Sequence, residues 1–166
     1  MQNLVATVLG NRNSGKSSTW NYIFEKTVKT GTNLRRLYFS KTEYIEVFLV
    51  SGSPEERDLY VGDIIGAAKP RVILCSMQYH FNVHRTIGYF RENDYMIYCQ
   101  WLNPGYHDGT TVSFFDDLGL SNQLLASGSI VSIRNGKTDL TDRCEELLSF
   151  IYGWAYYRGL ILIDNG

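Results

Sequence analysis

Two glycines, a lysine and a serine lie close together near the start of the chain, in the stretch VLGNRNSGKSSTW at residues 8–20. They match the pattern G-x-x-x-x-G-K-[ST], in which glycines let backbone N–H groups converge on phosphate oxygens. A helix that begins there adds its positive dipole end. Lys16 would reach the β- and γ-phosphates of a nucleotide, and the Ser17 hydroxyl would bind Mg²⁺. The predicted phosphate-binding residues are Gly10, Asn11, Arg12, Asn13, Ser14, Gly15, Lys16, Ser17 and Ser18.

The elements on either side of this loop are those that the pattern requires. Residues 4–10 form a short apolar run rich in β-branched side chains, which predicts a buried strand. Residues 15–28 carry apolar side chains at helical spacing, and Thr30 and Gly31 close the predicted helix. The order is therefore strand, glycine loop, helix.

The rest of the chain alternates strands and helices. Two strand-like runs, 35–40 and 44–50, are separated by only three residues, so we expect an antiparallel hairpin. Downstream strands are predicted at 71–77, 95–102 and 129–134, with helices at 53–69, 82–93, 110–127 and 139–159 and a possible short strand within 160–166. Residues 1–166 are thus predicted to form one α/β domain, with a mostly parallel sheet and helices on both faces.

The glycine loop resembles the Walker A motif of the P-loop NTPases, whose fold would cover essentially the whole chain. The predicted hairpin is similar to the layout of Ras-like GTPases, whereas P-loop nucleotide kinases have parallel strands there. The resemblance implies a three-layer fold with a mostly parallel six-stranded sheet and one antiparallel hairpin strand. It also implies slow hydrolysis of a purine nucleoside triphosphate, GTP or ATP, with Mg²⁺, and a switch that acts on a protein effector or regulator.

Two switch loops are part of that resemblance. The first contains a threonine that binds Mg²⁺ and senses the γ-phosphate; Thr30 and Thr32 lie in the right interval, and Thr32 is preferred, although both could simply serve turns. In the second, Gly52 would donate its N–H to the γ-phosphate and Glu55 would orient the attacking water. Where the family has an aspartate for the metal, this chain has serines at positions 51 and 53, so Mg²⁺ affinity and hydrolysis are both open.

Recognition of the base is expected near the end of the chain's fifth strand. The family's N-K-x-D motif is replaced by WLNPGYHD, in which Asn103 is suitably placed and Asp108 comes five residues later. Lys137, in RNGKTD, resembles part of the loop that covers the base. Asp116 and Asp117 superficially resemble an acidic Walker B end, but acids at the start of a helix are the favoured interpretation.

Two alternatives stay open. A module that binds nucleotide without hydrolysing it would fit the missing acid of the second switch. A kinase would fit the same loop with arginines 71, 85 and 91 around the transferred phosphate. A zinc site at His80, His84, His107 and Asp108 is disfavoured, because two histidines four residues apart are weak evidence without further ligands.

Composition narrows the class of partner. The net charge is −1, with 16 basic and 17 acidic residues, which argues against a nucleic-acid-binding surface. The three cysteines lack metal-ligand spacing and are expected to be buried thiols. Without a leader-like start or an apolar run of about 20 residues, we expect a cytoplasmic protein with no membrane span.

Overall fold

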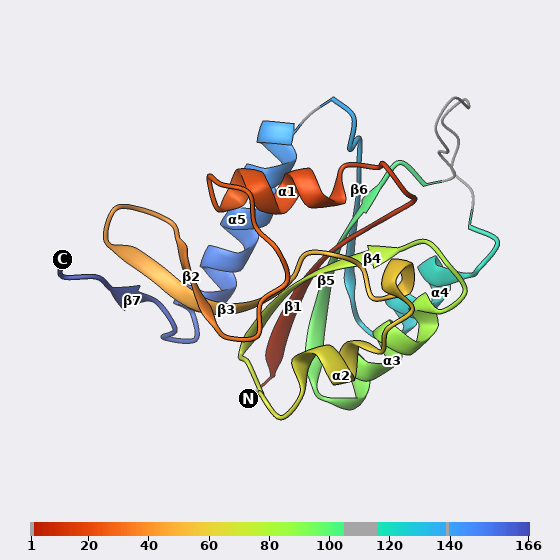
Figure 1. Cartoon of the computed structure of the whole chain (residues 1–166), viewed down its shortest axis with the longest axis horizontal. Helices are drawn as coiled ribbons and strands as arrows, with labels where there is room; N and C mark the ends of the chain where they lie inside the picture. Colours follow the sequence, from red (N-terminus) through yellow and green to blue (C-terminus); the bar gives the residue numbers. More distant parts are fainter. Residues whose placement is uncertain (1, 105–115, 139) are drawn as a thin grey trace.

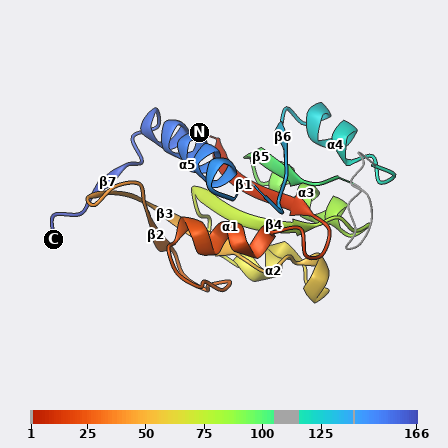
Figure 2. The same cartoon turned by 90° about the horizontal axis from the view of Figure 1, so that it is seen from above.

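The computed structural model describes residues 2–104, 116–138 and 140–166, and a single mixed sheet passes through them (Figure 1). Helices pack on both faces of this sheet (Figure 2). In chain order the elements are β1 (Asn3–Gly10), α1 (Lys16–Ile23), β2 (Arg35–Tyr38), β3 (Glu43–Val50), η1 (Glu55–Arg57), α2 (Val61–Ile65), β4 (Val72–Gln78), α3 (Val83–Glu92), β5 (Tyr95–Leu102), α4 (Leu120–Ala126), β6 (Ile130–Arg134), α5 (Leu140–Tyr156) and β7 (Leu162–Ile163).

The predicted hairpin is confirmed, because β2 and β3 pair antiparallel. The Ser40 hydroxyl accepts hydrogen bonds from the backbone N–H groups of Thr42 and Glu43, which tightens the turn between the two strands. The short C-terminal strand β7 is also present, and it adds an antiparallel partner to β3. The pairings of β4 with β3 and β1, of β1 with β5 and of β5 with β6 are parallel. The mostly parallel sheet has seven strands rather than the predicted six, because β7 also pairs with it.

The spatial order of the strands is β2-β3-β4-β1-β5-β6, so β4 lies between β3 and β1. Leu4 to Gly10 of β1 pair with Val72 to Gln78 of β4, and β3 pairs with the other edge of β4. Gln78 therefore ends the strand that lies between β1 and β3. Ser51, which follows β3, is one strand farther away.

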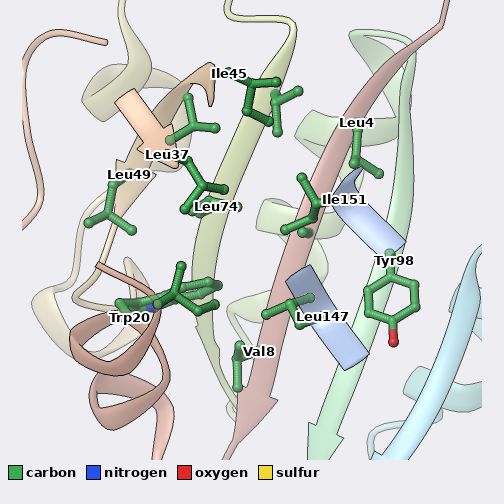
Figure 3. Close-up of a cluster of buried hydrophobic side chains, with 14 of the residues drawn as sticks. Leu4, Val8, Trp20, Leu37, Ile45, Leu49, Leu74, Tyr98, Leu147 and Ile151 are labelled. Atoms are coloured by element: carbon green, nitrogen blue, oxygen red, sulfur yellow. The ribbon is translucent and has the colours of Figure 1, made fainter. Parts of the chain in front are cut away.

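Two apolar cores lie on the two faces of the sheet, because alternate residues of a strand point to opposite sides. On one face, α1 and α5 cover the strands, and Trp20, Leu147 and Ile151 pack over them (Figure 3). On the other face, α2, α3 and α4 provide the cover, with Ile87 and Leu124 buried. The predicted placement of helices on both faces is confirmed.

Two predicted helices are shorter than expected. The first ends at Ile23, because Glu25 adopts a left-handed φ of 53° and the Asn21 side chain accepts a hydrogen bond from the N–H of Val28. The predicted helix at 53–69 is divided into η1 and α2, since Asp58 also has a left-handed φ, of 50°, and Tyr60 is extended. Local backbone conformations that helical spacing does not reveal caused both errors.

The helix predicted at 110–127 is observed as α4 only from Leu120, and residues 110–115 lie outside the described part of the chain. The Asp116 carboxylate accepts hydrogen bonds from the backbone N–H groups of Leu120 and Ser121. This contact confirms the interpretation of Asp116 as an acid at a helix start. Within the described ranges, no helix is long and apolar enough to cross a membrane.

Candidate functional site

The glycine loop, residues 10–17, connects β1 to α1 at the carboxyl edge of the sheet. A Cβ atom on Gly10 would lie 2.3 Å from the Ser14 hydroxyl oxygen and 3.2 Å from the carbonyl oxygen of Leu102, so a side chain there would displace Ser14. Gly15 has a φ of +102°, and a Cβ on it would lie 2.5 Å from the carbonyl oxygen of Gly136. Close contacts therefore favour glycine at both positions, and at Gly15 the backbone conformation favours it as well.

A cavity of about 980 Å³ opens beside this loop. Residues 12–18 line it from the loop and the first turns of α1. The residues that line it from elsewhere in the chain are Ser51, Glu55, Glu56, Gln78, His80, Gly136 and Lys137. Predicted site residues from three separate segments thus meet in one cavity.

Lys16 is folded back over the glycine loop and is only 6% exposed. Its Nζ donates hydrogen bonds to the carbonyl oxygens of Gly10 and Asn11, at 3.1 and 2.8 Å, and to Gln78 Oε1 at 2.8 Å. Burial lowers the pKa of the Lys16 amine, although the nearby Glu56 and Glu55 carboxylates oppose this. The ammonium group is thus held at the loop by three oxygen acceptors.

Gln78 is a site residue that the sequence analysis did not predict. Its side chain accepts from Lys16, and its backbone N–H donates to the Glu55 carboxylate at 2.9 Å. The available signal was its position, because a polar residue ends a largely apolar strand at the carboxyl edge of a parallel sheet. Which strand would lie beside β1 was not evident from the sequence.

Glu55 lines the cavity, but its carboxylate is also part of the structure around it. One oxygen accepts from the N–H of Gln78 and the other accepts from the Thr86 hydroxyl on α3. Burial raises the pKa of Glu55, and these two hydrogen bonds partly oppose the rise. Glu55 thereby joins η1 to β4 and α3.

The two predicted switch loops contact each other through Thr30 rather than Thr32. The Thr30 hydroxyl oxygen accepts from the backbone N–H groups of Ser51 and Gly52, at 3.0 and 3.3 Å. The Gly52 N–H, predicted to donate to a γ-phosphate, is thus bound to Thr30. Thr32 lines a separate cavity of about 480 Å³ beside β2. In this structure Thr32 therefore does not join Ser17 in the cavity of the glycine loop.

Asn103 connects the end of β5 to the loop between β6 and α5. Its Oδ1 accepts from the N–H of Gly136 at 2.6 Å, and its Nδ2 donates to the Asn135 side chain. That loop lies directly on the glycine loop, since a Cβ on Gly136 would lie 1.8 Å from the carbonyl oxygen of Ser14. Lys137, the next residue, lines the cavity, whereas Asp108 lies outside the described residues.

A second unpredicted residue, Arg143, reaches the glycine loop from α5. Its Nη2 donates to the carbonyl oxygen of Gly15 at 3.1 Å. The spacing of α5 offered a signal, because Arg143 lies one turn before Leu147 on the buried face of an amphipathic helix. An arginine at such a position must find polar partners inside the protein.

Of the described histidines and arginines that the zinc site and the kinase alternative invoke, only His80 lines the cavity. His80 lines it, but the His84 ring lies 2.7 Å from Gln123 Oε1 on α4. His107 is not among the described residues, and the described residues contain no group of three or more His, Cys, Asp or Glu that could hold a metal ion. Arg71 precedes β4, at the edge of the sheet opposite the glycine loop, and the Arg85 guanidinium lies over the Tyr60 ring.

Comparison with protein-family models and with curated proteins gives no relative from which a role could be transferred. No protein-family model matches the sequence. No curated protein matches it at a significant level. The functional argument therefore depends on the geometry of the cavity and on the chemistry of the residues that line it.

Proposed function

We propose that this chain is a P-loop protein, similar in layout to Ras-like GTPases, that binds a purine nucleoside triphosphate, GTP or ATP, with Mg²⁺ and hydrolyses it slowly. The observation that carries this proposal is the combination, in one cavity, of the glycine loop, the start of α1 and the buried Lys16. Backbone N–H groups at a helix start and an ammonium group are the donors that phosphate oxygens prefer.

The residues present fit a polyphosphate. Gly15 lines the cavity and brings the backbone to it without a side chain in the way. The Ser14 hydroxyl is buried and has no hydrogen-bond partner among the described residues, so it is a further polar group for a ligand to satisfy. Arg12 and Lys137 add positive charge to the cavity wall.

Binding would require Lys16 to exchange its partners. Its ammonium group would leave the carbonyl oxygens of Gly10 and Asn11 for phosphate oxygens, which are charged and therefore stronger acceptors. The Gln78 side chain would lose its donor at the same time. Because Glu55 holds the backbone of Gln78, that side chain would stay at the cavity and could bind a water molecule or a phosphate oxygen.

The metal would be held mainly by the ligand. Mg²⁺ commonly takes one or two protein oxygens together with phosphate oxygens and water. Ser17 and Glu56 both line the cavity and offer a hydroxyl and a carboxylate for this purpose. When bound, Mg²⁺ would neutralise charge on the β- and γ-phosphates. Thr32 could join this set only if the segment that precedes β2 moved.

A switch acting on a protein effector would use the contact between Thr30 and the residues after β3. The Thr30 hydroxyl holds two N–H groups there, at Ser51 and Gly52. A γ-phosphate that took the Gly52 N–H would leave Thr30 with the Ser51 N–H alone, which would weaken the contact between the two loops. Through this exchange of hydrogen bonds, a nucleotide in the cavity would change the surface that the two loops present to a protein effector.

A specific observation also favours the second candidate, a module that binds nucleotide without hydrolysis. Each oxygen of the Glu55 carboxylate already accepts a hydrogen bond inside the protein, and serines follow β3 where an acid is expected. The kinase candidate gains no such support. Its arginines are dispersed, and the hairpin is antiparallel.

The decisive experiment is equilibrium binding of GTP and of ATP, with and without Mg²⁺, together with measurement of phosphate release. Lys16→Ala should weaken binding about 10- to 100-fold, since a hydrogen bond to a charged group contributes about 1.5–3 kcal/mol. Lys69→Ala, at an exposed lysine that does not line the cavity, is the matched control and should bind normally. Binding without phosphate release would favour the non-hydrolysing module, and unchanged binding by Lys16→Ala would refute the proposal.

A further inference from the structure

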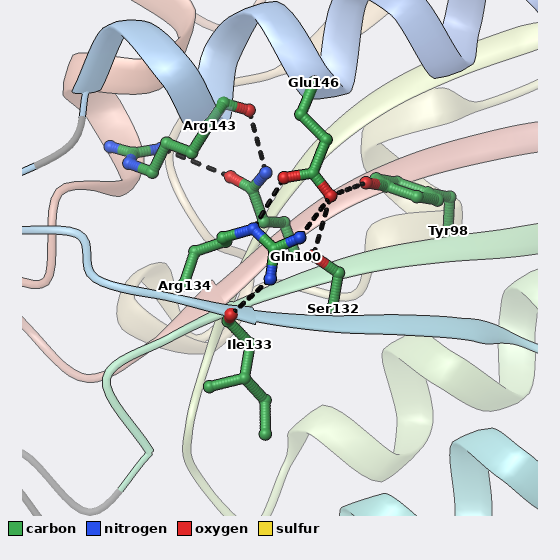
Figure 4. Close-up of polar contacts among 7 residues, drawn as sticks. All are labelled: Tyr98, Gln100, Ser132, Ile133, Arg134, Arg143 and Glu146. Carbon is green, nitrogen blue, oxygen red and sulfur yellow. Dashed lines mark hydrogen bonds and ion pairs between the residues drawn. The ribbon is translucent and has the colours of Figure 1, made fainter.

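Arg143 lies behind the glycine loop, on the side of α1 that faces α5, and is only 1% exposed. Its guanidinium donates to the carbonyl oxygen of Gly15, to the Thr19 hydroxyl at 2.5 Å and to Gln100 Oε1 at 3.5 Å. Gln100 also donates to the backbone carbonyl oxygen of Arg143 at 2.8 Å (Figure 4). The side chain is therefore held in one position against the first turn of α1.

Within the described part of the chain, this buried cation has only neutral acceptors. Its partners there are a carbonyl, a hydroxyl and an amide oxygen, and no described residue accepts a hydrogen bond from its Nε. Among the described residues no carboxylate lies within ion-pair distance of it, whereas Arg36 and Arg134 pair with Asp164 and Glu146. Burying an unpaired charge is costly, so a nearby anion would be strongly favoured.

The contact with Gly15 allows the Arg143 charge to act on the cavity through the peptide group between Gly15 and Lys16. In a trans peptide the C=O and N–H groups point in opposite directions. Because the Gly15 oxygen points toward Arg143, the Lys16 N–H of the same peptide points away from it. A charged donor on the oxygen polarises the peptide and strengthens the N–H as a donor.

We propose that Arg143 is a second cation of the phosphate site, which raises affinity for polyphosphates from behind the glycine loop without touching them. This inference rests on the proposed nucleotide binding and adds a positioning residue that the G-x-x-x-x-G-K-[ST] pattern does not contain. Because its effect is electrostatic, it grows with the number of phosphate charges.

The test compares how affinity depends on phosphate number in Arg143→Gln and Arg143→Lys. Equilibrium binding of ATP, ADP and AMP, and of the guanine series, is measured for each protein. Arg143→Gln should weaken triphosphate binding about tenfold, equivalent to about 1.4 kcal/mol, and weaken monophosphate binding much less. Arg143→Lys, which keeps the charge, should retain most of the wild-type ratio of triphosphate to monophosphate affinity.

Arg134→Gln is the matched control, because Arg134 is exposed, is paired with Glu146 and should leave this ratio unchanged. A folded Arg143→Gln protein with the wild-type ratio would overturn the inference, as would an equal loss in the lysine variant. Thermal unfolding establishes that each variant folds. If Arg143→Gln does not fold, Arg143→Lys decides. A ratio of triphosphate to monophosphate affinity well below that of the wild type would then overturn the inference, and a wild-type ratio would support it. Failure of the wild type to bind any nucleotide would instead refute the proposed function.

Discussion

Two polar networks near α5 differ in how completely their charges are matched. At the surface, Glu146 accepts from Nε and Nη2 of Arg134, at 2.6 and 2.7 Å, and from the hydroxyls of Ser132 and Tyr98 (Figure 4). At the glycine loop, Lys16 and Arg143 are buried, and their hydrogen bonds go to carbonyl, hydroxyl and amide oxygens. In the first network the charges of Arg134 and Glu146 are paired, whereas in the second neither cation forms an ion pair with a described carboxylate.

This difference distinguishes a structural network from one suited to a ligand. A paired surface network adds little stability and has no charge left to satisfy. A buried cation with only neutral acceptors retains a strong preference for an anion, because the low dielectric of the interior weakens its screening. Perturbing the loop network should therefore have larger effects than perturbing the surface pair.

The largest effect is expected from Gly136→Ala, which disrupts the packing of the loop between β6 and α5 against the glycine loop. The new Cβ would lie 1.8 Å from the Ser14 carbonyl oxygen, so the loop between β6 and α5 must move away from the glycine loop. We expect the free energy of unfolding to fall by about 3 kcal/mol, the upper end for overpacking. Urea unfolding measures this change. Gly88→Ala in α3 is the control, since a Cβ there would have no described neighbour within 4 Å apart from the adjacent residues and the nearby backbone of its own helix. Equal stability of the two variants would contradict the close approach of the loops.

A smaller effect is expected from Thr86→Val, which removes one donor from the buried Glu55 carboxylate. A hydrogen bond to a charged group contributes about 2 kcal/mol, so stability at neutral pH should fall by about that amount. Thr86→Ser keeps the hydroxyl and is the control. A variant as stable as wild type would show that this contact is not needed.

The same site predicts how stability depends on pH. Burial raises the pKa of Glu55 above its ordinary value of 4.5. The contribution of Glu55 to the free energy of unfolding is therefore greatest below pH 4.5, and it is lost as the pH rises through the folded-state pKa. Thr86→Val should extend this loss to higher pH, and Glu55→Gln should abolish it. Urea unfolding over a pH series tests both changes, and identical profiles for all three proteins would refute the assignment.

The smallest effect is expected from Glu146→Gln, which breaks the paired surface network. Arg134 and Glu146 are partly exposed, with side chains 42% and 34% accessible, so the loss should be at most about 1 kcal/mol and should shrink at high salt. Burial acts to raise the pKa of Glu146, but the hydrogen bonds and charge of Arg134 outweigh it and the net pKa is lowered. The stability that Glu146 contributes is thus present above its ordinary pKa and lost as the pH falls through the folded-state value. Urea unfolding at low and high salt measures the change, and a loss comparable to that of Gly136→Ala would reverse the ranking of the two networks.

Much of the fold could be predicted from local patterns. The three-residue gap before Tyr44 required an antiparallel hairpin, and the alternation of strands and helices predicted helices on both faces. The helix errors came from single residues with left-handed φ, Glu25 and Asp58, which carry no special signal because both are ordinary polar residues. Nucleotide specificity stays a prediction, since Asn103 holds a loop and Asp108 lies outside the described residues.

The sequence by itself determined the glycine loop, because Gly10, Gly15, Lys16 and Ser17 all lie within residues 10–17 and their effect on the backbone is local. Tertiary structure alone decided what surrounds that loop. The position of β4 beside β1 brought Gln78 to Lys16, and the packing of α5 on α1 brought Arg143 to Gly15. Strand order and helix packing join residues 62 and 128 positions apart, and periodicities of two and 3.6 residues carry no information over such separations.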